Sequence, residues 1–251
     1  VRIYLQLLKL IKIKAIKNYL KTYTIRILNS EEKLILSMVD LDHCELEQRT
    51  DFLHKEEIER YNKLVSKKRK REFILGKYCA KKSLLIENEK VVLTEININS
   101  GIFNQPIIKA PTIIKHFKIS ISHSEIITAG IAFPEGLLIG IDTETKLSNK
   151  STFVHSQLTI DEQQLVETKN INALHLWTAK ESLSKAILTG LTIDLKLLEV
   201  NSIDCRQNIM VITFKYFLAF KVYTIETSKN SFSIATPKKV NLNFDDLAKI
   251  Y

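Results

Sequence analysis

Two carboxylates, one residue apart, end an apolar run at residues 139–144, which read IGIDTE. Side chains at i and i+2 of a strand share a face, so Asp142 and Glu144 are expected to point the same way. Two like charges that close repel each other, and partial burial strengthens the repulsion. A hard cation such as Mg²⁺ would relieve it, because Mg²⁺ takes oxygen ligands from carboxylates and substrate phosphates. The alternative is a strand end in open water, since surface acids are common.

The composition indicates a folded protein of one large domain or two small lobes. Of its 251 residues, 45% are hydrophobic and 26% are charged, which excludes a disordered chain. The net charge of +9 favours an anionic partner, such as nucleic acid, a phosphate-rich small molecule or an acidic protein. The three cysteines lie far apart and have no C-x-x-C spacing: Cys44, Cys79 and Cys205. We therefore expect neither disulfides nor structural zinc, and we expect a cytoplasmic location.

The first thirty residues are rich in lysine. Lysines interrupt every apolar run before it reaches the roughly 18 residues of a membrane span, so we expect no membrane span. The same lysines scatter around a helical wheel, which gives a membrane-surface helix little support. We treat residues 1–31 as an N-terminal extension, with a misassigned start and an appended strand as open alternatives.

Hydrophobic spacing predicts a strand at residues 34–42 and two helices within residues 55–88. The run KKRKR at residues 67–71 lies between the two helical patterns. Such a run is usually a solvated helix face, although it also suggests a contact with phosphates.

Two apolar, β-branched runs, at residues 118–133 and 137–145, flank the turn residues 134–136. This pattern predicts a hairpin between them. In such a hairpin the Ser-His-Ser motif at residues 122–124 would emerge at the same end of the sheet as Asp142 and Glu144. We therefore expect these groups to converge on one spot.

A further helix is predicted at residues 159–168. Thr159 stands at the N-cap and Glu162 at N3, which is the pattern of a capping box. Beyond residue 199 the chain alternates apolar and polar positions, which predicts antiparallel strands followed by a terminal helical turn.

The segment 174–193 also reads as a helix. One apolar stripe runs along it, and Gly190 is a plausible stop. Glu181 and Lys185 fall on the opposite face at i and i+4. Taken alone, the two could form an ordinary surface pair of little energetic weight.

Three motifs occur in a recognisable order along the chain. They are Ser122-His123, then GIDTE at residues 140–144, then WTAKESLSK at residues 177–185. This order resembles the surfactin-synthetase-type 4′-phosphopantetheinyl transferases, over residues 34 to 245. Two positions depart from the family pattern: Gln105 replaces a basic residue before the Ser-His step, and Lys77 replaces an Arg after Gly76. Both departures concern affinity for coenzyme A.

The resemblance implies an enzyme that transfers the 4′-phosphopantetheine arm of coenzyme A to a serine of an apo acyl or peptidyl carrier protein. It implies an α+β fold, a pseudo-twofold pair of similar lobes that each pack a helix on a small antiparallel sheet. We set the lobes at residues 32–139 and 140–251. A monomer is expected, and carrier proteins of fatty-acid, polyketide or nonribosomal peptide biosynthesis are the candidate partners. The shorter trimeric type of synthase is disfavoured because this chain is about twice as long as one lobe requires.

The resemblance also implies roles for individual residues. Asp142, Glu144 and Glu181 would hold Mg²⁺, with Mn²⁺ as an alternative. Glu181, Asp142 and Lys185 are the catalytic candidates, with Glu181 or a metal-bound water removing the proton of the carrier serine. The coenzyme-binding candidates are Ser122, His123, Lys180, Lys185, Arg60 and Arg71, with Lys63 as a further candidate. Lys180 could instead pair with an acid, and Glu162 could position the coenzyme or only cap its helix.

A nucleic-acid-binding protein without catalysis is the alternative from another class. The net charge and the KKRKR run favour it. Aromatic residues make up only 8% of the chain and form no RNA-reading signature, and this alternative leaves the IGIDTE carboxylates unexplained. We therefore expect no nucleic-acid partner.

Overall fold

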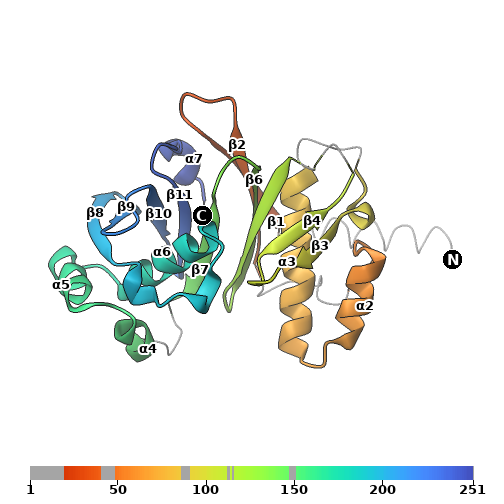
Figure 1. Cartoon of the computed structure of the whole chain (residues 1–251), viewed down its shortest axis with the longest axis horizontal. Helices are drawn as coiled ribbons and strands as arrows, with labels where there is room; N and C mark the ends of the chain where they lie inside the picture. The colour runs from red at the N-terminus through yellow and green to blue at the C-terminus, as the bar shows by residue number, and fades with distance from the viewer. Residues whose placement is uncertain are drawn as a thin grey trace.

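The computed structural model describes residues 20–40, 49–85, 91–111, 114, 116–146 and 151–250 (Figure 1). The strands are β1 (Leu20–Arg26), β2 (Lys33–Asp40), β3 (Asn97–Ser100), β4 (Pro106–Lys109), β5 (Phe117–His123), β6 (Ile127–Pro134), β7 (Gly140–Thr145), β8 (Val200–Arg206), β9 (Ile209–Phe214), β10 (Phe220–Glu226) and β11 (Asn230–Pro237). The α-helices are α2 (Lys55–Lys63), α3 (Lys67–Leu85), α4 (Ser151–Ser156), α5 (Ile160–Lys169), α6 (Ala173–Ala186) and α7 (Phe244–Leu247), and short 3₁₀ helices are η2 (Leu93–Glu95), η4 (Gly190–Thr192) and η5 (Leu195–Leu197). The strand at 34–42, the helices within 55–88 and the capping box at Thr159 are confirmed where the structure describes them.

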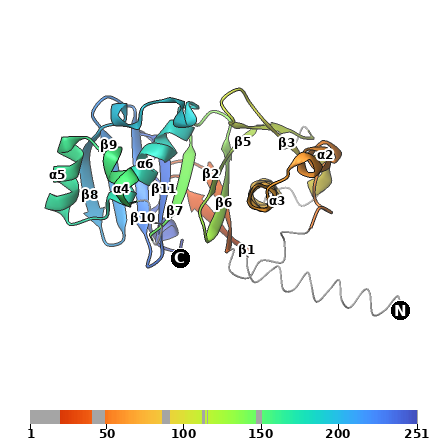
Figure 2. The same ribbon diagram turned by 90° about the horizontal axis from the view of Figure 1, so that it is seen from below.

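The two sheets repeat one arrangement. The first has the order β1-β2-β6-β5 and the second β7-β11-β10-β9-β8, and every pairing between neighbouring strands is antiparallel. In the first sheet the last strand, β6, lies between β2 and β5. In the second sheet the last strand, β11, lies in the same way between β7 and β10. A long helix packs on each sheet, α3 on the first and α6 on the second (Figures 1 and 2). The expected α+β fold with two similar lobes is confirmed.

In the first lobe, a buried ion pair joins two helices and a strand. Lys81 Nζ of α3 lies 2.5 Å from Glu57 Oε2, and both side chains are fully buried. Glu57 is the N3 residue of α2 and closes a capping box with His54. Its other oxygen, Oε1, accepts a hydrogen bond of 2.9 Å from the backbone of Ile98 in β3. Two backbone carbonyls also accept from Lys81, so the buried ammonium is fully bonded.

The second lobe repeats this arrangement. Lys180 Nζ of α6 lies 2.5 Å from Glu162 Oε2, again with both side chains fully buried. Glu162 is the N3 residue of α5 and closes a capping box with Thr159. Its Oε1 accepts a hydrogen bond of 2.8 Å from the backbone of Val200 in β8. Burial lowers the pKa of Lys180, and of Lys81 in the first lobe, below that of a free lysine, while the carboxylate partners oppose the shift.

One hydrophobic core lies between the two sheets. It contains side chains of β1, β2 and β6 from the first sheet and of β7, β10 and β11 from the second, including Leu36, Ile131, Ile141 and Phe232. The close approach of α6 to β7 depends on Gly140, because an added Cβ would lie 2.1 Å from Ser182 O. The glycine before the Asp142 strand therefore has a packing role.

The range 1–31 contains β1, which pairs with β2 along its whole length. This pairing agrees with an appended strand, and residues 1–19 lie outside the described residues. The C-terminal segment returns to the same strand: Arg26 donates from Nε to Asp246 Oδ2 at 2.7 Å and from Nη2 to Oδ1 at 3.0 Å. We retain a lobe boundary just before Gly140 as a proposal. Among the described helices, none is both long and apolar enough to span a membrane.

Two local predictions were wrong. The turn at residues 134–136 does not join a hairpin: β6 pairs with β5 and β2, whereas β7 pairs with β11 in the other sheet. Residues 134–136 do form a turn, but the chain crosses there from one sheet to the other. The hairpin is formed by β5 and β6, and its turn lies at residues 124–126. Helix α6 also ends at Ala186, before the expected stop at Gly190.

We predict that Lys81→Met and Lys180→Met each lower the free energy of unfolding by about 3–5 kcal/mol, because each leaves a buried carboxylate without its cation. Urea denaturation measures this change. Lys68→Met on the exposed face of α3 is the control, with an expected change within about 0.5 kcal/mol. Equal effects of the buried and exposed substitutions would show that neither pair stabilises the lobe that contains it.

A second prediction concerns acid stability. Its hydrogen bonds with Arg26 lower the pKa of Asp246 to about 2. A carboxyl group whose pKa is lower in the folded state stabilises the folded protein at pH values above its unfolded pKa, which is near 3.8. This stabilisation is lost as the pH falls through the folded pKa of about 2. Arg26→Gln should therefore be less stable than the native protein at pH 6, and the gap should narrow between about pH 4 and 2. Urea titrations at several pH values test this, with Arg69→Gln as control; a gap independent of pH would contradict the assignment.

Candidate functional site

The two sheets meet along β5 and β7, and serine hydroxyls make the contact. Ser120 Oγ accepts a hydrogen bond of 3.1 Å from Ile141 N, and Ser122 Oγ accepts one of 3.2 Å from Thr143 N. Ser120 and Ser122 alternate with apolar residues along β5, so both hydroxyls face β7. The edge of one sheet is therefore joined to the other through side chains.

Asp142 is the centre of this contact and is 3% exposed. Its Oδ1 accepts from Ser122 Oγ at 2.7 Å and from Lys185 Nζ at 2.7 Å. Lys185 also donates to Ser122 Oγ at 3.1 Å. The Ser-His motif, the GIDTE strand and the α6 helix thus converge as predicted, although β5 reaches β7 between sheets and not through a hairpin.

The second oxygen of Asp142, Oδ2, is buried and has no hydrogen-bond partner among the described residues. A buried carboxylate oxygen without a donor suits a cation ligand, because a negative group in the interior needs a positive partner. The residues present therefore fit a hard divalent cation in their donor atoms. Within the described ranges, however, no group of three or more His, Cys, Asp or Glu side chains is already arranged to hold a metal ion.

The other two predicted metal ligands lie on the same two elements as Asp142 and Lys185. Glu144 is two residues further along β7, so its side chain leaves the strand on the same face, and it is largely buried. Glu181 lies on α6, one turn before Lys185, and helps to line a cavity that Lys185 also lines. The set Asp142, Glu144 and Glu181 remains a prediction.

His123 packs against α3 and hydrogen bonds through Nδ1 with Thr128 Oγ1 at 3.1 Å. Gly76 makes room for the ring, because an added Cβ would lie 2.7 Å from His123 Cε1. Burial, and then the positive charges of Lys185 and Lys77, lower the pKa of His123 to about 4. The imidazole is therefore neutral at physiological pH, and a phosphate bound there would meet a hydrogen-bonding group and not a second cation.

The predicted coenzyme-binding residues of the first lobe lie on α2 and α3. The Arg60 guanidinium donates from Nη2 to Asn97 Oδ1 at 2.7 Å, which fixes its direction across α2 and β3. Arg71 is partly buried in the first turns of α3, and Lys63 is exposed at the end of α2. Lys77 is buried and donates to Ile98 O at 2.7 Å, and burial lowers its pKa to about 8.

Lys180 has a different place from the one expected for a coenzyme contact. Its ammonium is fully buried against Glu162 on the side of α6 turned away from Lys185, so it is not available to a pyrophosphate. The alternative of pairing with an acid agrees with this geometry. Glu162 is likewise inaccessible, which favours a structural role for it. We therefore leave both residues out of the coenzyme site.

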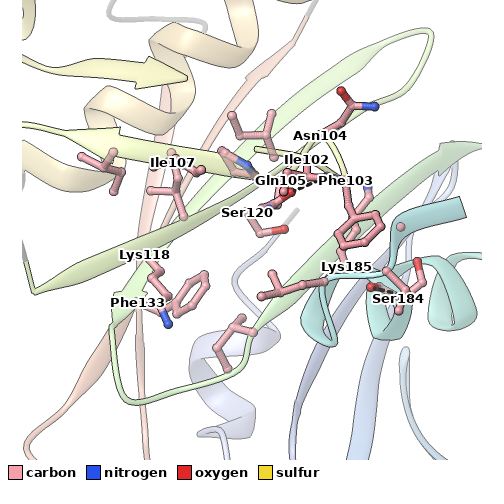
Figure 3. A pocket seen from close by; sticks show the side chains of 18 of the residues that line it. Ile102, Phe103, Asn104, Gln105, Ile107, Lys118, Ser120, Phe133, Ser184 and Lys185 are labelled. Atoms are coloured by element: carbon pink, nitrogen blue, oxygen red, sulfur yellow. Dashed lines mark hydrogen bonds between the residues drawn. The ribbon is translucent and has the colours of Figure 1, made fainter. Parts of the chain in front are cut away.

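A cavity of about 740 Å³ adjoins this cluster and lies between the lobes (Figure 3). Its walls come from the β3–β4 turn with β4, from strand β5, from Ile139 just before β7, and from the end of α6 with η4. Phe103, Ser184 and Lys185 lie toward one end of the cavity in Figure 3, and Lys118 and Phe133 toward the other. Gln105 lines the cavity and accepts from Phe103 N at 2.9 Å, so its amide holds the turn where a basic residue was expected.

Sequence reasoning missed several residues of this region. Ser120 could have been found, because it alternates with Ser122 in SISHS and so faces the same way. Phe103 and Leu188 carry no such signal, since a turn phenylalanine and a leucine after a helix are ordinary in sequence. Their place in the cavity wall follows only from the approach of the two lobes.

Comparison with known proteins agrees with this geometry. Residues 138–237, which run from just before β7 to the end of β11, match the model of the 4′-phosphopantetheinyl transferase superfamily. The match supports a relationship of this segment to that superfamily. It does not distinguish the surfactin-synthetase type from other members. No curated protein matches the chain.

The lowered pKa of the partly buried His123 leads to a third prediction. In a pH titration followed by NMR, the His123 ring should remain neutral at pH 6 and gain its proton only near pH 4. Lys185→Met should move that pKa upward, because one positive charge is removed, while burial keeps it below the usual 6.5. A normal titration near pH 6.5 in the native protein, or no shift in the variant, would contradict the placement of His123 beside Lys185.

Proposed function

We propose that this protein transfers the 4′-phosphopantetheine arm of coenzyme A to a serine of an apo acyl or peptidyl carrier protein and releases adenosine 3′,5′-bisphosphate. The observation that carries the proposal is the convergence of Ser122 with Asp142 and Lys185, because Asp142 and Lys185 lie within the segment that matches the superfamily model. This proposal also gives the carboxylates of Asp142 and Glu144 a role as metal ligands, whereas a nucleic-acid-binding protein without catalysis would leave them unexplained.

The reaction is a phosphoryl-type transfer. The serine hydroxyl of the carrier attacks the β-phosphorus of the coenzyme, and the bond from that phosphorus to the oxygen bridging it to the α-phosphorus breaks. Negative charge grows on the oxygens around the phosphorus, so catalysis needs positioning and nearby positive charge. Lys185 supplies such a charge, and its ammonium is already held in direction by Asp142 and Ser122. Glu181, on the same helix, would accept the serine proton.

A divalent cation completes the proposed site. Asp142, Glu144 and Glu181 would hold it, with Asp142 Oδ2 as the oxygen free to do so. Mg²⁺ is the cation we expect, with Mn²⁺ as a substitute, and when bound it would neutralise charge on the diphosphate.

The coenzyme would lie in the cleft between the lobes. Ser122 and His123 are the proposed phosphate contacts beside Lys185, and Arg60 and Arg71 are proposed for the 3′-phosphate. Each of these arginines can form paired hydrogen bonds with a phosphate, whereas Lys77 could contribute only a point charge. The proposed partner is a carrier protein of fatty-acid, polyketide or nonribosomal peptide synthesis, and the enzyme is proposed to act on it as a monomer in the cytoplasm.

The assay that tests the proposal combines the purified protein with coenzyme A, Mg²⁺ and a panel of apo carrier proteins, and reads the mass of each carrier. The native protein should add one phosphopantetheine arm to at least one carrier, and removal of the metal with EDTA should stop the reaction. Modification of no carrier in the panel would count against the proposed function.

A fourth prediction concerns the negative charge of Asp142 in the proposed site. Asp142→Asn should lower turnover by about 10²–10³-fold, because it keeps the shape but removes the charge that faces Lys185 and the proposed cation. Circular dichroism checks that the variant is folded. Asp204→Asn, at an exposed site on β8, is the matched control and should retain full activity. Normal turnover of Asp142→Asn with Mg²⁺ would remove Asp142 from the proposed metal site.

A further inference from the structure

Helix α6 ends in a Schellman turn with an unusual residue in it. Thr189 N donates to Ser184 O at 2.9 Å, and Leu188 N donates to Lys185 O at 3.2 Å, which are the two hydrogen bonds of that motif. The turn places Leu188 at C′ with φ of 61°, in the left-handed region. Glycine is the usual residue there, because a side chain at positive φ is strained.

The other described residues with positive φ show how unusual this leucine is. Apart from one glycine they are Asn29, Asn104, Asn170 and Gln207, all with polar amide side chains. Asparagine visits this region readily, whereas a bulky aliphatic residue is an outlier. A strained residue that persists at the edge of a cavity indicates that its side chain has a use there.

The side chain of Leu188 forms part of an apolar wall of the cavity. Leu188 is 45% exposed, and Phe103 of the β3–β4 turn and Leu191 of η4 line the same space and are also exposed. The turn and η4 come close to each other, since an added Cβ on Gly190 would lie 3.7 Å from Phe103 O. Both lobes therefore contribute to an apolar surface that remains open to solvent.

We propose that this wall receives the pantetheine arm of coenzyme A, and that Leu188 and Phe103 determine how tightly the arm is held. The inference rests on the proposed function. The arm is uncharged and carries two amides and a dimethyl-substituted carbon, so it suits apolar walls with a few hydroxyls. The cavity offers both, with Ser184 and Thr189 among its lining residues.

Two further observations favour the arm over a face of the carrier protein. The cavity volume of about 740 Å³ lies in the range of small-molecule sites, whereas a carrier would need a broad surface. Lys185 and Glu181 line the same cavity, so an arm whose phosphate lies at Lys185 would extend along the apolar wall. Glycine at residue 188 would relieve the strain but remove this apolar side chain from the cavity wall.

The test compares two ligands that differ only in the arm and the phosphate that carries it. Coenzyme A and adenosine 3′,5′-bisphosphate are titrated into the native protein, Leu188→Gly and Phe103→Ala by calorimetry with Mg²⁺ present. In both variants the Kd of coenzyme A should rise about three- to tenfold, as expected for the loss of one partly buried apolar contact. The Kd of adenosine 3′,5′-bisphosphate should not change. Leu188→Gly should also melt about 2–4 °C higher, because the strain is gone.

Gln207→Gly is the matched control, since it relieves positive φ in the turn between β8 and β9, outside the cavity. It should raise the melting temperature while leaving both Kd values unchanged. Equal weakening of both ligands by the cavity variants, or unchanged binding of coenzyme A, would overturn the inference. So would an effect limited to the KM of the carrier, which would make the wall a protein-docking surface. A native protein that binds neither ligand would instead overturn the proposed function itself.

Discussion

A charge removed from water must be paired, and this constraint organises both lobes. In each lobe a glutamate at the third position of a short helix caps that helix and neutralises a lysine of the long helix. The same glutamate accepts a hydrogen bond from a backbone N–H at the start of a strand. Three elements are thus fixed to one another by one side chain. In the second lobe the lysine is Lys180, and the next residue is Glu181. Neighbours on a helix point about 100° apart, so the buried pair sets the rotation of α6 that turns Glu181 and Lys185 toward the cavity.

The contact between the lobes is organised differently. Strands β5 and β7 lie at the edges of their sheets and are joined by Ser120 and Ser122, and behind them the sheets share a hydrophobic core. The same hydroxyl that accepts from Thr143 N also donates to Asp142. Any change in the separation of the sheets would therefore alter the surroundings of the central carboxylate. The proposed site lies at this interface and depends on both lobes being in place.

Much of this arrangement was predictable from the sequence, because local signals and global structure agree. The capping box at Thr159 and Glu162, the helical stripe of α6 and the acids of β7 were all visible. The route of the chain was not, because a Pro-Glu-Gly turn suits a hairpin and a crossing between sheets equally well. The burial of Lys180 was also hidden, since a lysine beside a catalytic candidate looks like a ligand until its helix is placed. The left-handed conformation of Leu188 had no local signal at all.

The repeated lobes suggest two units that could be separated, yet the C-terminal segment prevents it. After β11 the chain crosses to the first sheet, where Leu242 bridges to Ile27 and Asp246 holds Arg26. A fragment beginning at Gly140 would leave this segment without its strand and expose the apolar face that it covers. The two lobes are therefore expected to fold and unfold as one cooperative unit.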